Sequence, residues 1–174
     1  MSRSAMNHKN QTKSEIGCVI YTVSSSRTQS TDESGFLLAD LLEEAGHRVE
    51  DREIISDKRD LIMSRLSEAI ETSGIRVVIF TGGTGLSSRD LTPETVQESL
   101  DKLLPGFGEL FRHLSFAEIG PRAFLSRALA GLKSDTLIFS IPGSPDAARL
   151  AAEKLIVPTI GHALFEIDKE GLAE

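Results

Sequence analysis

Short runs of apolar residues, many of them β-branched, recur along the chain, and polar or glycine-rich stretches separate them. Continuous apolar runs of this length predict strands that are buried on both faces. They lie at 18–23, 75–80 and 135–141, and a more polar stretch at 48–55 can form a further strand. Elsewhere, apolar residues recur at the spacing of helices that bury one face. This pattern predicts helices at 36–45, 57–73, 94–104, 107–119, 122–132, 145–156 and 160–167.

The predicted strands and helices alternate along the chain. This order favours an α/β fold in which mostly parallel strands are joined by right-handed crossovers and covered by helices on both faces. No repeat or linker interrupts the pattern, so we expect a single domain at 15–170 after a disordered polar tail at 1–14. In open sheets of this kind, ligands bind beyond the carboxyl ends of the strands. The loops that follow the predicted strands are therefore the first candidates for a functional site.

The composition narrows the class of protein. The 174 residues include 19 basic and 26 acidic side chains, and the formal net charge of −7 argues against a nucleic-acid-binding protein. The single cysteine excludes an intrachain disulfide framework and a cysteine-built zinc site. No apolar run is long enough to cross a bilayer, and the first residues lack the apolar core of a secretory signal. We therefore expect a cytoplasmic protein with no membrane and no nucleic-acid partner.

A glycine-rich loop follows the strand predicted at 75–80. Gly82, Gly83 and Gly85 allow positive φ angles, and the N–H groups exposed in this way can form a nest for an anion. Thr81 and Thr84 add neutral hydroxyl donors. The alternative is a tight turn without a ligand, which the glycines alone support almost as well. The loop is not a Walker loop, since no Gly-Lys-Ser/Thr follows, and it lacks the third glycine of a dinucleotide fingerprint.

Two aspartates follow strands at the same predicted edge. Asp90 comes just after the glycine loop, and Asp57 follows the strand predicted at 48–55. A carboxylate beside a bound phosphate repels it unless a cation lies between them, and Mg²⁺ favours one or two carboxylates together with phosphate oxygens. Each aspartate taken alone can equally be a turn or helix-capping residue. Together, facing a glycine loop, they favour a magnesium site.

Two further loops belong to this edge. Pro142, Gly143 and Ser144 lead from the strand at 135–141 into a helix whose first N–H groups and dipole can attract an anion. A plain turn closed by prolines explains the same residues equally well. In the polar loop that begins at Ser24, hydroxyl groups crowd near Asp32, and a flexible loop without a ligand is the favoured interpretation there.

The remaining candidates favour structural roles. Cys18 lies inside an apolar strand, which is typical of an inert buried thiol. The histidines follow no metal-ligand spacing. A series of phenylalanines favours core packing or a subunit interface over a stacking platform, and it comprises Phe107, Phe111, Phe116 and Phe124.

Several motifs in one order along the chain resemble a known family. They are TGGTG at 81–85, RDLTPE at 89–94, PGFGE at 105–109, LSR at 125–127 and PGS at 142–144. Their order and spacing resemble the molybdopterin-binding superfamily that includes MoaB, MogA and the gephyrin G-domain, over roughly residues 17–167. The stretches FGELFR at 107–112 and LSFAEIG at 114–120 are most similar to the MoaB branch.

The resemblance implies a three-layer α/β/α fold, assembled as a homotrimer or hexamer. Active members of the superfamily adenylylate molybdopterin: with Mg²⁺, the terminal phosphate of the pterin attacks the α-phosphate of ATP and pyrophosphate is released. The implied cofactor is therefore Mg²⁺, and the implied substrates are ATP and molybdopterin. Handover of the product to the molybdenum-insertion enzyme is a further implied partnership.

The resemblance also assigns roles to residues. Asp57 and Asp90 match the aspartates that serve metal binding, substrate placement and catalysis, and the division of these roles between them stays open. Asp57 is the residue found in active relatives, which favours an enzyme. The residues implied to bind substrate or nucleotide are Ser24, Thr81, Gly82, Gly83, Thr84, Gly85, Ser126, Arg127, Pro142, Gly143 and Ser144.

Two other functions compete with adenylylation. A MoaB-type paralogue can hold molybdopterin or a precursor without transferring AMP, and the intact Asp57 and Asp90 argue for transfer instead. The related competence-damage domain with nucleotide-hydrolase activity usually departs from TGGTG and belongs to a longer chain, so both features argue against it. A nicotinamide-dependent Rossmann enzyme is disfavoured, because no acidic ribose-binding residue follows a proper glycine fingerprint.

Overall fold

The computed structural model describes residues 15–169, so the tail expected at 1–14 lies outside the described residues. Its centre is one six-stranded sheet with the strand order β2-β1-β3-β6-β5-β4. The first four strands of this order run parallel, whereas β5 is antiparallel to both of its neighbours. The strands are β1 (Gly17–Val23), β2 (Arg48–Ile55), β3 (Ile75–Thr81), β4 (Lys102–Leu103), β5 (Leu129–Lys133) and β6 (Thr136–Ile141).

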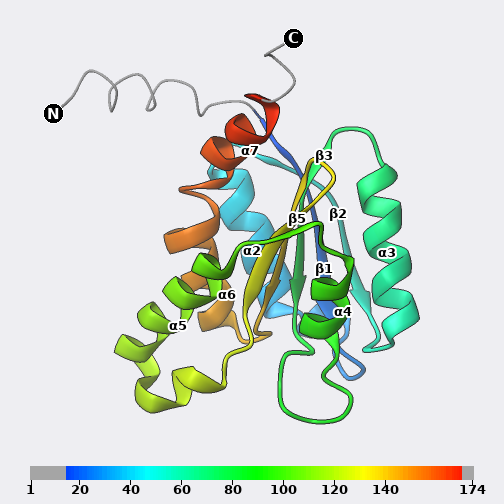
Figure 1. Cartoon of the computed structure of the whole chain (residues 1–174). Helices are drawn as coiled ribbons and strands as arrows, with labels where there is room; N and C mark the ends of the chain where they lie inside the picture. Colours follow the sequence, from blue (N-terminus) through cyan, green and yellow to red (C-terminus); the bar gives the residue numbers. More distant parts are fainter. Residues whose placement is uncertain (1–14, 170–174) are drawn as a thin grey trace, which may run out of the picture.

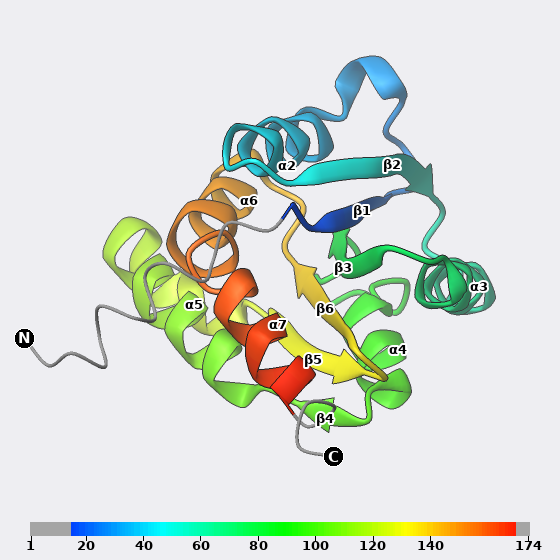
Figure 2. The same cartoon turned by 90° about the horizontal axis from the view of Figure 1, so that it is seen from above.

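Helices cover both faces of the sheet, which confirms the three-layer α/β/α fold. Figure 2 shows α2 (Glu33–Glu44), α5 (Pro105–Ile119), α6 (Pro145–Ala151) and α7 (Ile160–Asp168) on one face. The opposite face carries α3 (Arg59–Glu71) and α4 (Thr92–Ser99). Shorter segments are the 3-10 helices η1 (Gln29–Thr31) and η2 (Gly120–Leu125) and the π-helix η3 (Ala152–Ile156). No helix among residues 15–169 is long and apolar enough to cross a membrane.

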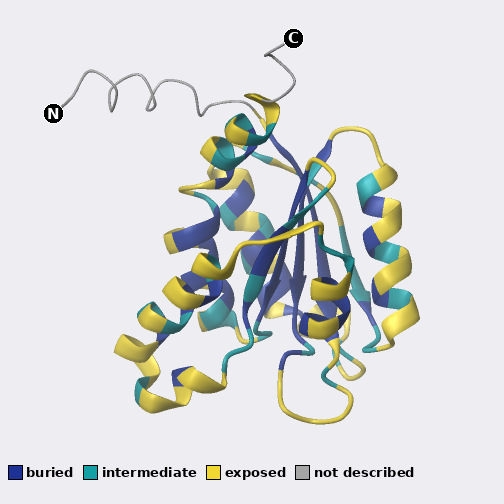
Figure 3. Cartoon of the chain, in the orientation of Figure 1, coloured by how far each residue is buried: buried dark blue, intermediate teal, exposed yellow. Residues whose placement is uncertain are grey.

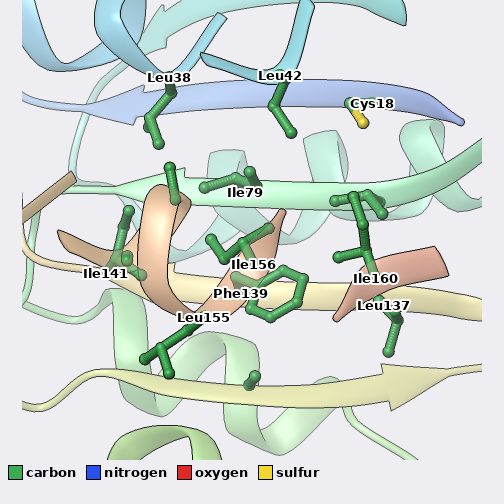
Figure 4. Close-up of a cluster of buried hydrophobic side chains, with 14 of the residues drawn as sticks. Cys18, Leu38, Leu42, Ile79, Leu137, Phe139, Ile141, Leu155, Ile156 and Ile160 are labelled. Atoms are coloured by element: carbon green, nitrogen blue, oxygen red, sulfur yellow. The ribbon is translucent and has the colours of Figure 1, made fainter. Parts of the chain in front are cut away.

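Two apolar clusters hold the layers together. Alternate side chains of a strand point to opposite faces, so Cys18 and Ile20 of β1 join the cluster beneath α2, α5, α6 and α7. Figure 4 shows part of this cluster, with side chains from the strands meeting those of the helices. Val19 and Tyr21 join the smaller cluster beneath α3 and α4. The central strands are therefore buried on both faces, as the dark blue arrows in Figure 3 show.

The four strands predicted from the sequence are confirmed as β1, β2, β3 and β6. The helix predicted at 122–132 is wrong, because this stretch forms η2 and then β5. Alanine and leucine favour a helix locally, but β5 pairs with β6 along its whole length. A Cβ at Gly131 would lie 2.6 Å from the Lys102 carbonyl oxygen, so the neighbouring strand leaves no room for a side chain there. Long-range pairing thus overrides local propensity.

Several helix boundaries also differ from the prediction, and two of them have a clear cause. The helix predicted at 94–104 ends at Ser99, because Lys102 and Leu103 pair with β5. The helix predicted at 36–45 begins earlier, at Glu33, since the Asp32 side chain accepts a hydrogen bond from the Gly35 N–H and caps the first turn. The polar loop expected to be flexible therefore ends in a buried helix cap.

Candidate functional site

The loops that follow β1, β2, β3 and β6 meet at the carboxyl edge of the sheet, at the bottom of Figure 1. The longest is the green loop between β3 and α4, which carries the TGGTG motif. Figure 3 shows that most of this loop is exposed, whereas the strand that leads into it is buried. The structure thus collects the loops named from the sequence at one edge.

The start of the glycine loop requires glycine. Gly82 has φ +107° and Gly83 has φ +60°, which are conformations that other residues adopt at a cost. A Cβ at Gly82 would lie 2.4 Å from the Val23 carbonyl oxygen, so the loop passes against the end of β1. The Gly82 N–H donates to the Ile141 carbonyl oxygen at 3.0 Å, which extends the β3–β6 pairing into the loop.

Beyond Gly82 the loop offers hydrogen-bond donors. Within residues 15–169, the backbone N–H groups of Gly83 and Thr84 donate to no other group. Thr84 is buried, while residues 85–89 are exposed. Unused N–H groups in two successive residues, the first a glycine with positive φ, form the kind of concavity that binds anions.

Asp90 closes the glycine loop on itself. Its Oδ2 accepts hydrogen bonds from the Ser87 hydroxyl at 2.6 Å and from the Ser87 N–H at 2.9 Å. The Ser87 hydroxyl, followed by the N–H groups of Ser87 and Gly85 and the charge of Arg127, lowers the pKa of Asp90 below its ordinary value of 3.8 and outweighs desolvation. Asp90 is therefore an anion at neutral pH, half-buried among loop donors.

Arg127 contacts the same loop from the other side. Its Nε donates to the Thr84 carbonyl oxygen at 3.1 Å, and its Nη2 donates to the carbonyl oxygens of Gly85 at 2.5 Å and Asp90 at 2.6 Å. Its Nη1 pairs with the Glu94 carboxylate on α4. The adjacent Ser126 turns toward its own chain, since its Oγ accepts from the Ala128 N–H at 3.4 Å.

The loop after β6 packs against the start of the glycine loop. The Thr81 hydroxyl donates to the Pro142 carbonyl oxygen at 3.2 Å. A Cβ at Gly143 would come within 3.0 Å of the Gly82 Cα, so the two backbones are in contact. Ser144 caps α6, because its hydroxyl accepts the Ala147 N–H at 3.3 Å. These residues align the first turn of α6 with the glycine loop.

The loops after β1 and β2 are joined to each other. The Ser24 N–H donates to the Ile55 carbonyl oxygen at 2.9 Å, and the Ser25 hydroxyl donates to Asp57 Oδ1 at 2.6 Å. Among the described residues no hydrogen bond or ion pair links Asp57 with Asp90. The two aspartates thus lie at the same edge of the sheet, but on different loops with different partners.

Sequence reasoning missed a buried ionic network beside these loops. Asp32 is fully buried, and it accepts hydrogen bonds from the Thr22 hydroxyl at 3.0 Å and from Arg52 at 2.6 Å. Arg27 lies 3.8 Å from Asp32 and donates to the Gly143 carbonyl oxygen at 2.7 Å. The available signal was the position of Asp32 just before an apolar helical run, which is typical of a helix cap.

The site can hold a metal ion only with the help of ligands from a substrate or from water. Within residues 15–169, no group of three or more His, Cys, Asp or Glu side chains could hold a metal ion alone. Mg²⁺ commonly takes one or two carboxylates and completes its shell with substrate phosphates and water. Asp90 and Asp57 each offer a carboxylate of the kind that this mode of binding needs. Cys18 is buried and desolvation raises its pKa to about 12, so it is not a nucleophile at this site.

Comparison with known proteins identifies the family and the relatives of this chain. The family described as "Probable molybdopterin binding domain" matches residues 19–162. Molybdenum cofactor biosynthesis protein B of Bacillus cereus is 45% identical over 168 residues, which cover 96% of this chain and 99% of the relative. The protein of the same name from Escherichia coli K12 is 45% identical over 141 residues, which cover 81% of this chain and 83% of the relative.

Solved structures agree with the sequence relatives. A crystal structure of molybdenum cofactor biosynthesis protein B is 46% identical and superposes with a TM-score of 0.87, covering 90% of this chain and 98% of the other. The tungsten cofactor synthesizing protein MoaB from Pyrococcus furiosus is 33% identical with a TM-score of 0.79, covering 88% and 97%. The chain therefore belongs to the molybdopterin-binding family of molybdenum cofactor biosynthesis proteins, among the relatives of MoaB and MogA.

Proposed function

We propose that this protein acts in molybdenum cofactor biosynthesis by adenylylating molybdopterin with Mg-ATP. The observation that carries the proposal is the glycine loop after β3, which combines unused N–H donors with a carboxylate, Asp90, held in its charged form. Donors of this kind bind phosphates, whereas an anion beside them is useful when a cation bridges it to the substrate. Two phosphate-bearing substrates and one metal ion satisfy both requirements.

The proposed reaction needs placement more than a protein nucleophile. An oxygen of the molybdopterin phosphate forms a new bond to the α-phosphorus of ATP, the bond from that phosphorus to the bridging oxygen breaks, and pyrophosphate leaves with the electron pair. The substrate supplies the attacking oxygen, so the protein contributes orientation and electrostatic stabilisation. The N–H groups of Gly83 and Thr84 would hold phosphate oxygens.

Mg²⁺ would be held by Asp90, with Asp57 as a second ligand or as a residue that places the pterin. When bound, the ion supplies neutralisation of the charge that develops on the phosphates. Asp57 is already oriented by the Ser25 hydroxyl, and Asp90 by Ser87. Each carboxylate is thus fixed by a neutral donor, which leaves its charge available to a cation.

The decisive experiment is turnover with purified protein, molybdopterin and Mg-ATP, in which adenylyl-molybdopterin and pyrophosphate are quantified. We expect product from the wild-type chain and none from Asp57→Ala or Asp90→Asn. Asp40→Asn, an exposed aspartate on α2, is the matched control and should retain full turnover. Absence of wild-type product together with tight molybdopterin binding would instead identify a MoaB-type binding protein. Wild-type turnover in Asp90→Asn would remove Asp90 from the mechanism.

We further propose that the protein assembles as a homotrimer or hexamer through an apolar surface on α5 and η2. Phe124 and Phe116 are 77% and 59% exposed there, and a hollow of about 510 Å³ lies between them and Pro121. Exposed apolar patches of this kind are typical of subunit contacts. The product would then pass to the enzyme that inserts the metal.

A further inference from the structure

Almost all hydrogen-bond donors of the Arg127 side chain bind groups of the protein itself. It lies between η2 and β5, and four of its five N–H donors contact groups of the glycine loop or of α4. Three of the acceptors are backbone carbonyl oxygens, from Thr84, Gly85 and Asp90. A guanidinium group in this state has little capacity left to bind a substrate phosphate.

The contacts of Arg127 determine where the loop's N–H groups point. A trans peptide is planar, so its carbonyl oxygen and the following N–H face opposite directions. Holding the Thr84 oxygen toward Arg127 therefore turns the Gly85 N–H away from it. That N–H is among the groups that stabilise the Asp90 carboxylate. Arg127 and Asp90 thus hold the two sides of one peptide group.

The remaining contacts restrain the ends of the loop. Arg127 Nη2 also binds the carbonyl oxygen of Asp90 itself, 2.6 Å away. The Glu94 carboxylate on the first turn of α4 pairs with Nη1 and opposes rotation of the guanidinium. The loop is therefore held at its glycines, at Asp90 and at the helix that follows. A planar fork with several donors can make these contacts together, whereas a lysine ammonium cannot.

We propose that Arg127 is a positioning residue, which orders the glycine loop and thereby places Asp90, and that it is not a ligand of the substrate. The expected effect of Arg127 on turnover assumes the proposed adenylylation of molybdopterin. Its expected effect on the order of the glycine loop does not depend on that reaction. The free protein should already show the order that Arg127 imposes, because every contact described above joins Arg127 to a group of the protein itself.

The test compares Arg127→Gln and Arg127→Lys with a matched control, Arg76→Gln. Arg76 is as exposed as Arg127, at 26% of its side chain, and it also binds a carbonyl oxygen and a carboxylate, from Asp135 and Asp168. It stands at the opposite end of β3 from the glycine loop. Substitution at either position therefore removes hydrogen bonds to a carbonyl oxygen and to a carboxylate, but Arg127 makes more of them and only Arg127 is beside Asp90.

The first measurement is amide hydrogen exchange of the ligand-free proteins. We expect peptides covering 82–91 to exchange about tenfold faster or more in both Arg127 variants, with other peptides unchanged, because the loop loses hydrogen bonds to a charged group. Arg76→Gln should leave 82–91 as in the wild-type chain. Unchanged exchange in 82–91 in the Arg127 variants would overturn the proposal, and so would a uniform increase across all peptides.

The second measurement is turnover of the same variants. We expect kcat to fall about a hundredfold in both Arg127 variants, including the lysine variant that keeps the charge, since small displacements of a reacting group are costly. A loss of turnover with normal exchange in 82–91 would make Arg127 a substrate ligand and overturn the inference while the proposed function stands. If the wild-type chain itself shows no turnover, the proposed function fails and the exchange measurement alone decides the role of Arg127.

Discussion

At the scale of single residues, the site depends on the groups that surround two carboxylates, those of Asp32 and Asp90. Asp32 is fully buried, and a buried charge is tolerated only when it is paired and hydrogen-bonded. Arg52, Thr22 and the Gly35 N–H supply those partners, and Arg27 continues the network to Gly143. Asp32 thus caps α2 and also supports two of the loops at the site.

Removal of Asp32 should therefore destabilise the whole protein. For Asp32→Ala we expect the free energy of unfolding to fall by about 3–5 kcal/mol, because Arg52 is left without its carboxylate and α2 without its cap. Asp40→Ala, on an exposed position of the same helix, should change it by less than about 0.5 kcal/mol. Urea denaturation measures both values. Equal stability of the two variants would contradict the role assigned to Asp32.

The lowered pKa of Asp90 predicts that the stability of the folded protein depends on pH. Its pKa in the folded protein is lower than the ordinary value of 3.8, first because of the Ser87 hydroxyl. The carboxylate therefore contributes stability that is fully present above 3.8 and is lost as pH falls through the lower, folded pKa. Thermal unfolding from about pH 7 to about pH 2.5 should show wild type more stable than Asp90→Asn, with the difference shrinking only below 3.8. A difference that grows on acidification would contradict this assignment.

At the scale of elements, the glycine loop is an extension of β3 that β1 and β6 hold in place. Val23 at the end of β1 and Ile141 at the end of β6 both contact Gly82, and Arg127 holds the loop from η2 and β5. The loop is thus exposed at its tip but fixed at its base. Such a base restrains the orientation of the N–H groups that follow it in the loop.

Gly82→Ala should disturb this base. The φ of +107° and the 2.4 Å approach to the Val23 carbonyl oxygen should lower the free energy of unfolding by at least about 1–2 kcal/mol and reduce turnover. The matched control is Gly106→Ala in the first turn of α5, where a Cβ meets nothing within 4 Å. That variant should be neutral or up to about 1 kcal/mol more stable. Equal effects of the two substitutions in urea denaturation would contradict the close approach at Gly82.

At the scale of the whole molecule, the two faces of the sheet differ. The larger cluster packs beneath four helices, and beyond it α5 and η2 expose apolar side chains such as Leu110 and Phe124. The other face carries α3 and α4 over the smaller cluster. The asymmetry favours the self-association proposed through α5 and η2.

A charged residue in this surface should separate the subunits. We expect Phe124→Asp to sediment as a monomer under conditions in which the wild-type chain is a trimer or hexamer, because a buried carboxylate without a partner opposes association. Met63→Asp, at an exposed apolar position on α3, should leave the assembly intact. Sedimentation velocity distinguishes these states. A wild-type chain that is already monomeric, or a Phe124→Asp chain that still assembles, would contradict the proposed interface.

Features that depend only on residues close together in the sequence could be predicted from the sequence alone. Continuous apolar runs identified β1, β3 and β6, because a strand buried on both faces leaves no polar positions. The glycine loop and Asp90 could be named as candidates in the same way, since they lie within ten consecutive residues. The placement of these loops at one edge followed from the parallel order of the strands.

Features that depend on distant residues were decided by the tertiary structure. Leu129–Lys133 has a helical composition locally, and it is a strand because β6 offers its backbone groups for pairing. Arg127 reaches a carbonyl 43 residues away, and Arg52 pairs with Asp32 across 20 residues. The direction of an arginine side chain depends on which acceptors the fold brings near it, and residue spacing carries no information about that. For this reason the contacts of Arg127 with the glycine loop and the buried charge of Asp32 are evident only in the tertiary structure.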